Sequence, residues 1–217
     1  MTLVDAIKAR DLAAARAALA DAPSSAGTPS PEGSAPICLA MYYRAPDIAE
    51  AIAAAKGDLD IFEAIVLGRE DRVAALLDAD PATARAVAAD GFPTLGLASY
   101  MRQSGVARLL LDRGADPNQA AANPTKVAPL HSAVAADAAD IVAMLLDAGA
   151  DVNARQQMDY TPLMGAAANA RLALLDLLLA RGADPSLRTA DGKTAADLAR
   201  EHGHADIAAR LDALASS

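Results

Sequence analysis

Residues 129–153 read PLHSAVAADAADIVAMLLDAGADVN, and this stretch decides the fold. Leu130, Ala133 and Val134 share one face of a short predicted helix, because positions three and four apart lie together on a helix. A second helix is predicted after a tight turn, since its apolar residues follow the spacing i, i+1, i+4 and i+5. Gly149 then ends this second helix, at a position that favours a left-handed residue.

The same pattern returns downstream at a fixed interval. Pro129 is matched by Pro162, and Gly149 by Gly182, in each case 33 residues further along the chain. A repeat of this length is typical of a solenoid, in which each helix pair completes its core only by stacking on its neighbours. The sequence therefore predicts an all-α repeat solenoid of stacked helix-turn-helix units.

Two short motifs recur in phase with this interval. They are APLH at 128–131 and TPLM at 161–164, with the endings GADPN at 114–118, GADVN at 149–153 and GADP at 182–185. These motifs resemble those of ankyrin repeat proteins, of the free-standing bacterial type. The resemblance implies short β-hairpin fingers between the helix pairs, and about six to seven repeats including degenerate terminal caps.

We expect the whole chain to form a single ankyrin repeat solenoid. Its predicted parts are an N-terminal cap pair with a long finger (1–35), degenerate repeats (36–87), regular repeats (88–186) and a C-terminal capping repeat (187–217). Residues 21–35 are rich in Pro, Ser and Gly, which allows a linker, but their phase favours a finger. Between the second and third pairs the interval shortens to 24 residues, which predicts a tight connection near Gly57 and Asp58 without a finger.

Composition limits which partners and which cellular compartment are expected. The net charge of −9 argues against nucleic acid or an anionic membrane as partner, because phosphate binding needs clustered Lys and Arg. A single cysteine, Cys38, rules out an internal disulfide and suits a reducing compartment. The first residues carry charges in place of an apolar signal core, and no run of about 18 apolar residues occurs. We expect a cytoplasmic location.

Catalytic and metal chemistry find little support in the motifs. The sequence lacks G-x-S-x-G, Walker A and H-E-x-x-H patterns, so we predict no enzyme, no catalytic residue and no cofactor. The resemblance to ankyrin repeats implies that the His131 ring bonds to the backbone of the next repeat. Ala128 stands where the family usually has the Thr that partners this histidine, so the local hydrogen-bond network is incomplete. His202 and His204 flank a turn without a third ligand, so no metal site is predicted. Cys38 is interpreted as a buried, inert thiol.

The aromatic residues are the informative ones, since they make up only 3% of the chain. Phasing the repeats places all four tyrosines on the surfaces that contact partners in ankyrin-like proteins, and Tyr is enriched at interfaces. We expect the strongest contacts in the first half, because the later groove positions are mostly Ala. The predicted partner-binding residues are Tyr42, Tyr43, Arg44, Val66, Leu67, Phe92, Tyr100, Met101, Arg102 and Tyr160.

The predicted function is a non-enzymatic protein-protein interaction module that binds an unidentified partner protein through its concave face and finger tips. Within the predicted site, Arg44 and Arg102 are candidates to anchor a carboxylate of that partner. Two alternatives stay open: a regulatory inhibitor of the immunity type that masks an enzyme, and a self-associating structural protein. We expect a monomer, with self-association as the alternative that sedimentation would test.

Overall fold

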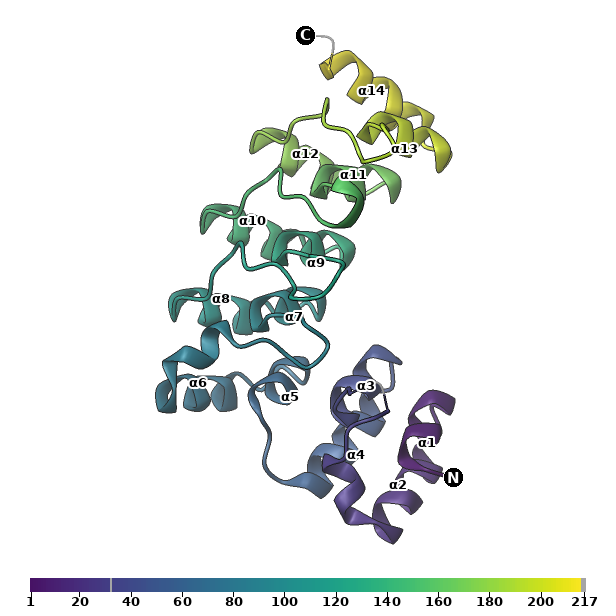
Figure 1. The fold of residues 1–217 in the computed structure, drawn as a ribbon, viewed down its shortest axis with the longest axis vertical. Coiled ribbons are helices and arrows are strands. Elements are labelled where there is room, and N and C mark those ends of the chain that lie inside the picture. The colour runs from purple at the N-terminus through teal and green to yellow at the C-terminus, as the bar shows by residue number, and fades with distance from the viewer. Residues whose placement is uncertain (32, 216–217) are drawn as a thin grey trace. The chain divides into compact units, whose positions relative to one another are not determined.

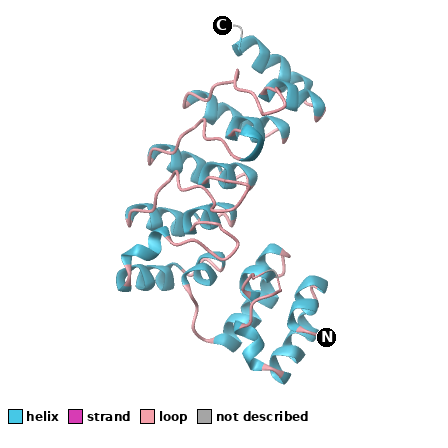
Figure 2. Cartoon of the chain, viewed as in Figure 1, coloured by secondary structure: helices cyan, strands magenta, loops and turns pink. Residues whose placement is uncertain are grey.

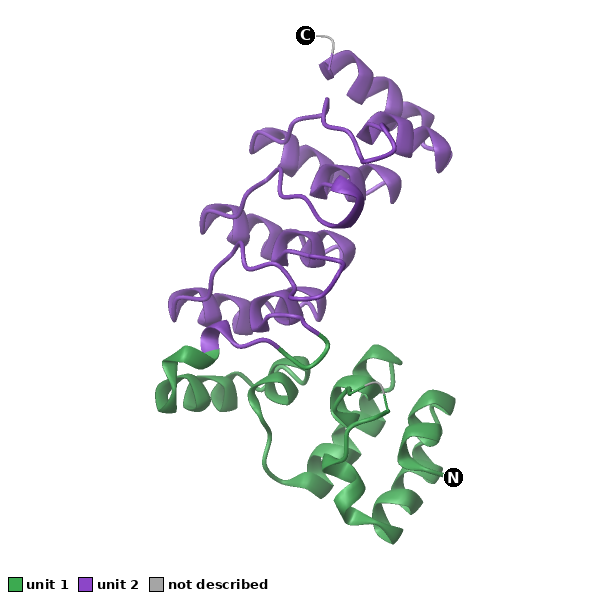
Figure 3. Ribbon diagram, viewed as in Figure 1, with its two compact units in different colours: residues 1–83, 88–90 green, residues 84–87, 91–217 purple. Residues whose placement is uncertain are grey.

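The computed structural model describes residues 1–31 and 33–215, and in this part of the chain the regular structure is helical (Figure 2). The helices come in pairs, each a shorter one followed by a longer one. The chain divides into two compact units, the first made of residues 1–83 and 88–90 and the second of residues 84–87 and 91–217 (Figure 3). None of the described helices is long and apolar enough to cross a membrane.

Unit 1 contains three helix pairs. They are α1 (Leu3–Ala9) with α2 (Leu12–Asp21), α3 (Pro36–Tyr42) with α4 (Pro46–Lys56), and α5 (Ile61–Val66) with α6 (Glu70–Ala79). The short helices α1, α3 and α5 pack in succession, and α2 packs against α4. The core of this unit is built from branched aliphatic side chains that are fully buried, namely Ile7, Ile37, Ile48, Ile52 and Ile65. Most of these core positions recur along the chain, as a stacked repeat requires.

Within its described residues, unit 2 contains four helix pairs, which follow one another along the chain (Figure 1). They are α7 (Thr94–Tyr100) with α8 (Ser104–Asp112), α9 (Pro129–Ala135) with α10 (Ala139–Asp147), α11 (Pro162–Ala168) with α12 (Leu172–Ala180), and α13 (Ala195–Glu201) with α14 (Ala205–Ala215). The shorter helices α7, α9, α11 and α13 pack in order, and α10 packs against both α8 and α12. Leu110, Leu145 and Leu178 hold the same place in successive pairs and are all fully buried.

Proline and capping residues begin the short helices. Pro36, Pro129 and Pro162 each occupy the first turn, where the missing N–H has no partner to lose. In α13 the hydroxyl of Thr194 accepts from the N–H of Asp197, whose carboxylate accepts from the N–H of Thr194 in return. These signals are local, so each repeat begins at the same phase of the sequence.

The predicted β-hairpin fingers do not form strands in the described residues. The only strand-type pairing there is an isolated antiparallel bridge between Val87 and Pro93. The fingers are turns, closed by one backbone hydrogen bond from Ala121 to Val127, from Gln156 to Tyr160 and from Thr189 to Lys193, at 2.9, 3.0 and 2.9 Å. Their arms are too short to add a second rung, so a ladder cannot start.

The connections between the helices differ in length and structure. Between α4 and α5 only residues 57–60 intervene, so the predicted tight connection is confirmed. Between α2 and α3 lies a 3₁₀ helix, η1 (Pro23–Gly27), which packs against α2 and α4. Two further 3₁₀ helices are η2 (Pro81–Arg85) and η3 (Gln157–Asp159).

Candidate functional site

The predicted contact residues of unit 1 lie around the end of α3. Tyr42 is half-buried, and its hydroxyl donates to Asp90 Oδ2 at 3.0 Å. Tyr43 follows as the helix cap and is also half-buried, while Arg44 is exposed with φ 56°. Tyr42 therefore has an internal structural bond, and Tyr43 with Arg44 forms the accessible part of this group.

Helix α5 corrects one of the sequence expectations. Val66 was expected on the partner face, but its side chain is completely buried. Helix α5 is one residue shorter than α3, which rotates its last apolar residue into the core of unit 1. Leu67, the next residue, is half-buried at the helix cap. Only Leu67 of this pair keeps any accessible surface for a partner.

Tyr100 is the most exposed of the predicted aromatic contacts. It is the last residue of α7 in unit 2 and has 52% of its surface exposed. Met101 caps this helix and is half-buried. Arg102 follows in a left-handed conformation, φ 59°, and its Nη1 donates to the carbonyl of Ala136 in the next repeat at 3.0 Å. The three residues form a continuous accessible corner of unit 2.

Phe92 and Tyr160 precede the starts of α7 and α11, and both are half-buried. The Tyr160 hydroxyl donates to the carbonyl of Met164 at 3.3 Å, and burial raises the pKa of its phenol. Because Tyr160 is half-buried and its hydroxyl bonds to α11, it offers a partner less surface than Tyr100 does.

The structure confirms the repeat-bridging role of His131. Its Nε2 lies 3.0 Å from the carbonyl oxygen of Tyr160 in the next repeat. Its Nδ1 has no hydrogen-bond partner among the described residues, as the missing hydroxyl at Ala128 predicts. Burial lowers the pKa of His131 below its ordinary value, so the ring is held neutral.

The remaining candidates for chemistry are Cys38 and the two histidines near the C-terminus. Cys38 is buried, and burial together with the carboxylates of Asp60 and Glu63 raises the pKa of its thiol to about 12. His202 Nδ1 lies 2.9 Å from the carbonyl of Leu198. No cluster of three metal-ligating side chains occurs within residues 1–31 and 33–215.

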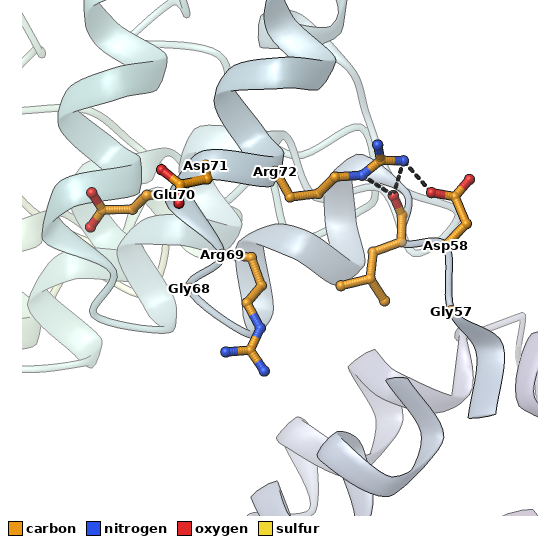
Figure 4. A pocket seen from close by; sticks show the side chains of 8 residues that line it. Gly57, Asp58, Gly68, Arg69, Glu70, Asp71 and Arg72 are labelled. Carbon is orange, nitrogen blue, oxygen red and sulfur yellow. Dashed lines mark hydrogen bonds and ion pairs between the residues drawn. The ribbon is translucent and has the colours of Figure 1, made fainter. Parts of the chain in front are cut away.

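A hollow of about 700 Å³ lies in unit 1 beside the short connection between α4 and α5, and sequence analysis did not foresee it (Figure 4). It is lined by Gly57, Asp58, Leu59, Gly68, Arg69, Glu70, Asp71 and Arg72. Arg72 donates to the carbonyl of Leu59 through Nε and Nη2, at 3.0 and 2.8 Å, and pairs with Asp58. Both guanidinium groups are engaged, since Arg69 pairs with Glu50.

A partly buried ion pair joins α4 to α5 across this connection. Glu63 is fully buried at the position that His131 holds in its own repeat, and both its carboxylate oxygens accept from Lys56 Nζ, at 2.7 and 2.5 Å. The backbone N–H of Asp60 donates to the same carboxylate at 3.0 Å. The shortened spacing between the pairs was the only sequence signal for this arrangement.

The chain is similar to known repeat proteins over most of its length. A family model described as ankyrin repeats (3 copies) matches residues 51–156, and another described as ankyrin repeats (many copies) matches residues 145–199. Together they cover residues 51–199, from within α4 of unit 1 to within α13 of unit 2.

Relatives of known name match shorter segments. Human ankyrin repeat domain-containing protein 37 is 37% identical over 99 residues, which is 46% of this chain and 62% of that protein. Human espin-like protein is 47% identical over 57 residues, and the mitochondrial disaggregase of Bos taurus is 46% identical over 63 residues. Those two matches cover 26% and 29% of this chain but only 6% and 9% of the relatives.

The chain thus spans less than two thirds of each of these relatives. What the family models share with this chain is the ankyrin repeat, which here forms successive helix pairs. The chain belongs to the ankyrin repeat family.

Proposed function

We propose that this protein is a non-enzymatic interaction module that binds a partner protein through its concave face and finger tips. Ankyrin repeats are generally protein-protein interaction modules, and they typically bind protein partners. The observation that carries the proposal for this chain is Tyr100, which leaves 52% of its surface exposed in a sequence with only six Phe and Tyr residues. An exposed tyrosine combines a large apolar area with a polar tip, which suits an interface.

The surroundings of Tyr100 support the same conclusion. Met101 adds apolar surface beside it, and Arg102 holds a guanidinium at the edge of the corner. The next repeats place Ala135 and Ala168 at the position of Tyr100, and both side chains are small, Ala135 exposed and Ala168 buried. A partner can therefore approach the backbone of α9 and α11 closely while it covers the Tyr100 ring. In unit 1, Tyr43 and Arg44 supply a second, separate contact group.

The test is affinity capture from native lysate, followed by mass spectrometry. The compared proteins are the wild type, Tyr100→Ala, Tyr43→Ala and the matched control Leu172→Ala. Leu172 lies on α12 and is 51% exposed, so the control removes a similar exposed apolar area from a longer helix. Circular dichroism confirms beforehand that all variants are folded.

We expect one captured protein to be lost with Tyr100→Ala and kept with Leu172→Ala, because truncating an interface tyrosine costs about 2 kcal/mol or more when it is a hot spot. Retention of every captured protein by both tyrosine variants would contradict the proposed face. Sedimentation of the wild type separates partner binding from self-association. A protein that stays monomeric at high concentration excludes self-association.

A further inference from the structure

The finger that precedes α11 carries a residue that neither the turn nor the core favours. Met158 and Asp159 are consecutive left-handed residues, with φ 63° and 58°. Methionine in this conformation is strained, and Met158 is 56% exposed, so it gains little from burial. Where the backbone and the core both disfavour a side chain, an observed outlier of this kind points to function.

The neighbouring fingers can be compared at the position of Asp159. Gly91 and Gly192 hold the position that corresponds to Asp159, with φ 90° and 86°. Lys126 holds it in the finger before α9, with φ 51°. In two consecutive fingers, Lys126 and Asp159 therefore stand where glycine would form the turn without strain.

These tips form one continuous strip in unit 2. The N–H of Gln157 donates to the carbonyl of Thr125 at 2.8 Å, and the N–H of Ala190 donates to the carbonyl of Met158 at 2.9 Å. Each finger is thus hydrogen-bonded to the next. We call residues 122–127, 155–160 and 187–193 the finger strip. Met158 lies in its middle finger, held from both sides by backbone bonds.

The charge of the finger strip is opposite to that of the chain. It holds four basic side chains, Lys126, Arg155, Arg188 and Lys193, against the two acidic ones Asp159 and Asp191, which gives +2 in a chain of −9. Asp191 and Asp159 pair only within the strip, with Lys193 at 3.6 Å and with Arg155 at 3.5 Å.

Two positive charges of the strip are left over. Lys126 is exposed and makes no ion pair with any residue that the structure describes. Arg188 is also exposed, and its Nη1 donates to the uncharged carbonyl of Gly192 at 2.7 Å. These cations lie in the fingers on either side of the one that carries Met158, so they flank an apolar anchor.

We propose that the finger strip binds an acidic segment of the partner protein, whose carboxylates meet Lys126 and Arg188 while an apolar side chain covers Met158. This inference rests on the proposed interaction function and names the chemistry of the partner at one of its surfaces. Charge complementarity of this kind steers the encounter and selects the partner. A protein segment is favoured over nucleic acid because it can supply both the carboxylates and the apolar side chain that covers Met158.

The test uses two fluorescein-labelled peptides of about 12 residues in low salt, measured by fluorescence anisotropy under conditions where charge is weakly screened. One alternates Glu and Ser around a central Leu, and the other has Gln in place of every Glu. A single-stranded DNA oligonucleotide of similar charge is the third probe. Wild type should bind the Glu peptide, and should bind the Gln peptide and the oligonucleotide more weakly.

Three variants locate the site. Replacing Lys126, Arg155 and Arg188 together by Gln should weaken Glu-peptide binding roughly tenfold, since exposed ion pairs contribute modestly and add up. A charge-matched control replaces Arg10, Arg16 and Arg108, all exposed outside the strip, and should leave binding unchanged. Met158→Gly should weaken binding about threefold or more while raising the urea midpoint, because glycine relieves the left-handed strain.

The outcomes separate this inference from the function on which it rests. Equal loss in the charge-matched control, tighter binding of the oligonucleotide, or no binding of the Glu peptide would each overturn the acidic-segment inference. If partner capture from lysate still depends on Tyr100 in that case, the interaction function stands and only the finger strip is wrong. A Met158→Gly variant that gains stability and keeps full peptide affinity would remove Met158 from the site.

Discussion

At the scale of single residues, the turn between the two helices of each repeat is the most demanding position. It requires a left-handed backbone, and Gly203 supplies it in the last repeat with φ 84°. Ala170 occupies the same place one repeat earlier with φ 51°, where its Cβ crowds the following carbonyl at a cost of roughly 1 kcal/mol. Arg102 and Asp137 accept the same conformation in the repeats before it.

Ala170→Gly should therefore raise the free energy of unfolding by about 0.5–1 kcal/mol, because the relief of strain exceeds the added entropy of the unfolded chain. Urea unfolding followed by circular dichroism measures it. The control is Ala209→Gly, the same exchange at an exposed position inside α14, which should cost about 1 kcal/mol. The explanation is wrong if the two substitutions change stability in the same direction.

His131 links stability to pH. Its pKa is lowered in the folded protein by burial, so the unfolded chain binds a proton first as the pH falls. Below the ordinary histidine pKa of about 6.5, stability should decline with a slope of at most roughly 1.4 kcal/mol per pH unit from this group. Above that pH the neutral His131 ring makes its full contribution to the free energy of unfolding. The effect comes from protonation of the ring that approaches the Tyr160 carbonyl.

The measurement is the urea midpoint of the wild type and of His131→Gln at pH 7.5 and 5.5. The amide of Gln can still donate to the Tyr160 carbonyl but does not titrate in this range. We expect the wild type to lose more stability than the variant between the two pH values. Equal losses would place the acid sensitivity on other groups.

At the scale of elements, the repeats are joined by asparagine side chains at the base of the fingers. Asn118 donates from Nδ2 to the carbonyl of Gly149 at 2.9 Å and accepts at Oδ1 from the N–H of Asp151 at 2.8 Å. Asn153 makes the same two bonds to the following repeat, at 3.4 and 2.9 Å. One amide thus satisfies a carbonyl and an N–H at the end of the next helix pair, groups that a helix terminus leaves open.

Asn118→Ala should destabilise the protein by about 1–2 kcal/mol, since it removes two hydrogen bonds between successive repeats. Ser186 provides the control, because it holds the equivalent position in the last ending, and its hydroxyl bonds only Asp184 of the same repeat. Ser186→Ala should therefore change stability by less than about 0.5 kcal/mol. Thermal and urea unfolding of both variants would test this, and an equal cost for both would exclude the bridging role.

At the scale of the whole molecule, the two units differ in composition as well as in their repeats. Residues 1–83 and 88–90 carry 14 acidic and 7 basic side chains, a net charge of −7, and the remainder carries 14 and 12, a net charge of −2. The four pairs of unit 2 exceed the roughly three repeats that a solenoid needs for stability. Leu110, Leu145 and Leu178 are fully buried in regular repeats of this unit, so unit 2 has a core of its own.

A fragment of residues 84–217 should therefore fold by itself, with a cooperative urea transition and helical circular dichroism. Leu145→Ala in this fragment should cost about 2–5 kcal/mol, because it opens a cavity in the middle of the stack. The same substitution in the full chain should cost the same if unit 2 is independent. A fragment without helical signal would show that the single solenoid predicted from the sequence unfolds as one body.

The sequence by itself determined the period, the helix pairs, the positions of the turns and the short connection after α4. These features follow from local physics: apolar spacing selects the helix, Pro and Thr begin it, and left-handed residues end it. The resemblance to ankyrin repeats placed His131 between repeats and singled out Tyr100 as a candidate contact, and Cys38 was predicted to be buried.

Only the tertiary structure decided which of these residues are accessible. Val66 is buried and Tyr100 is exposed although both end a short helix, because accessibility depends on how far each helix extends and on neighbours distant in the sequence. Successive fingers are hydrogen-bonded to one another, which no local pattern reveals. The left-handed conformation of Met158 belongs to the folded finger strip, so the sequence alone did not point to it.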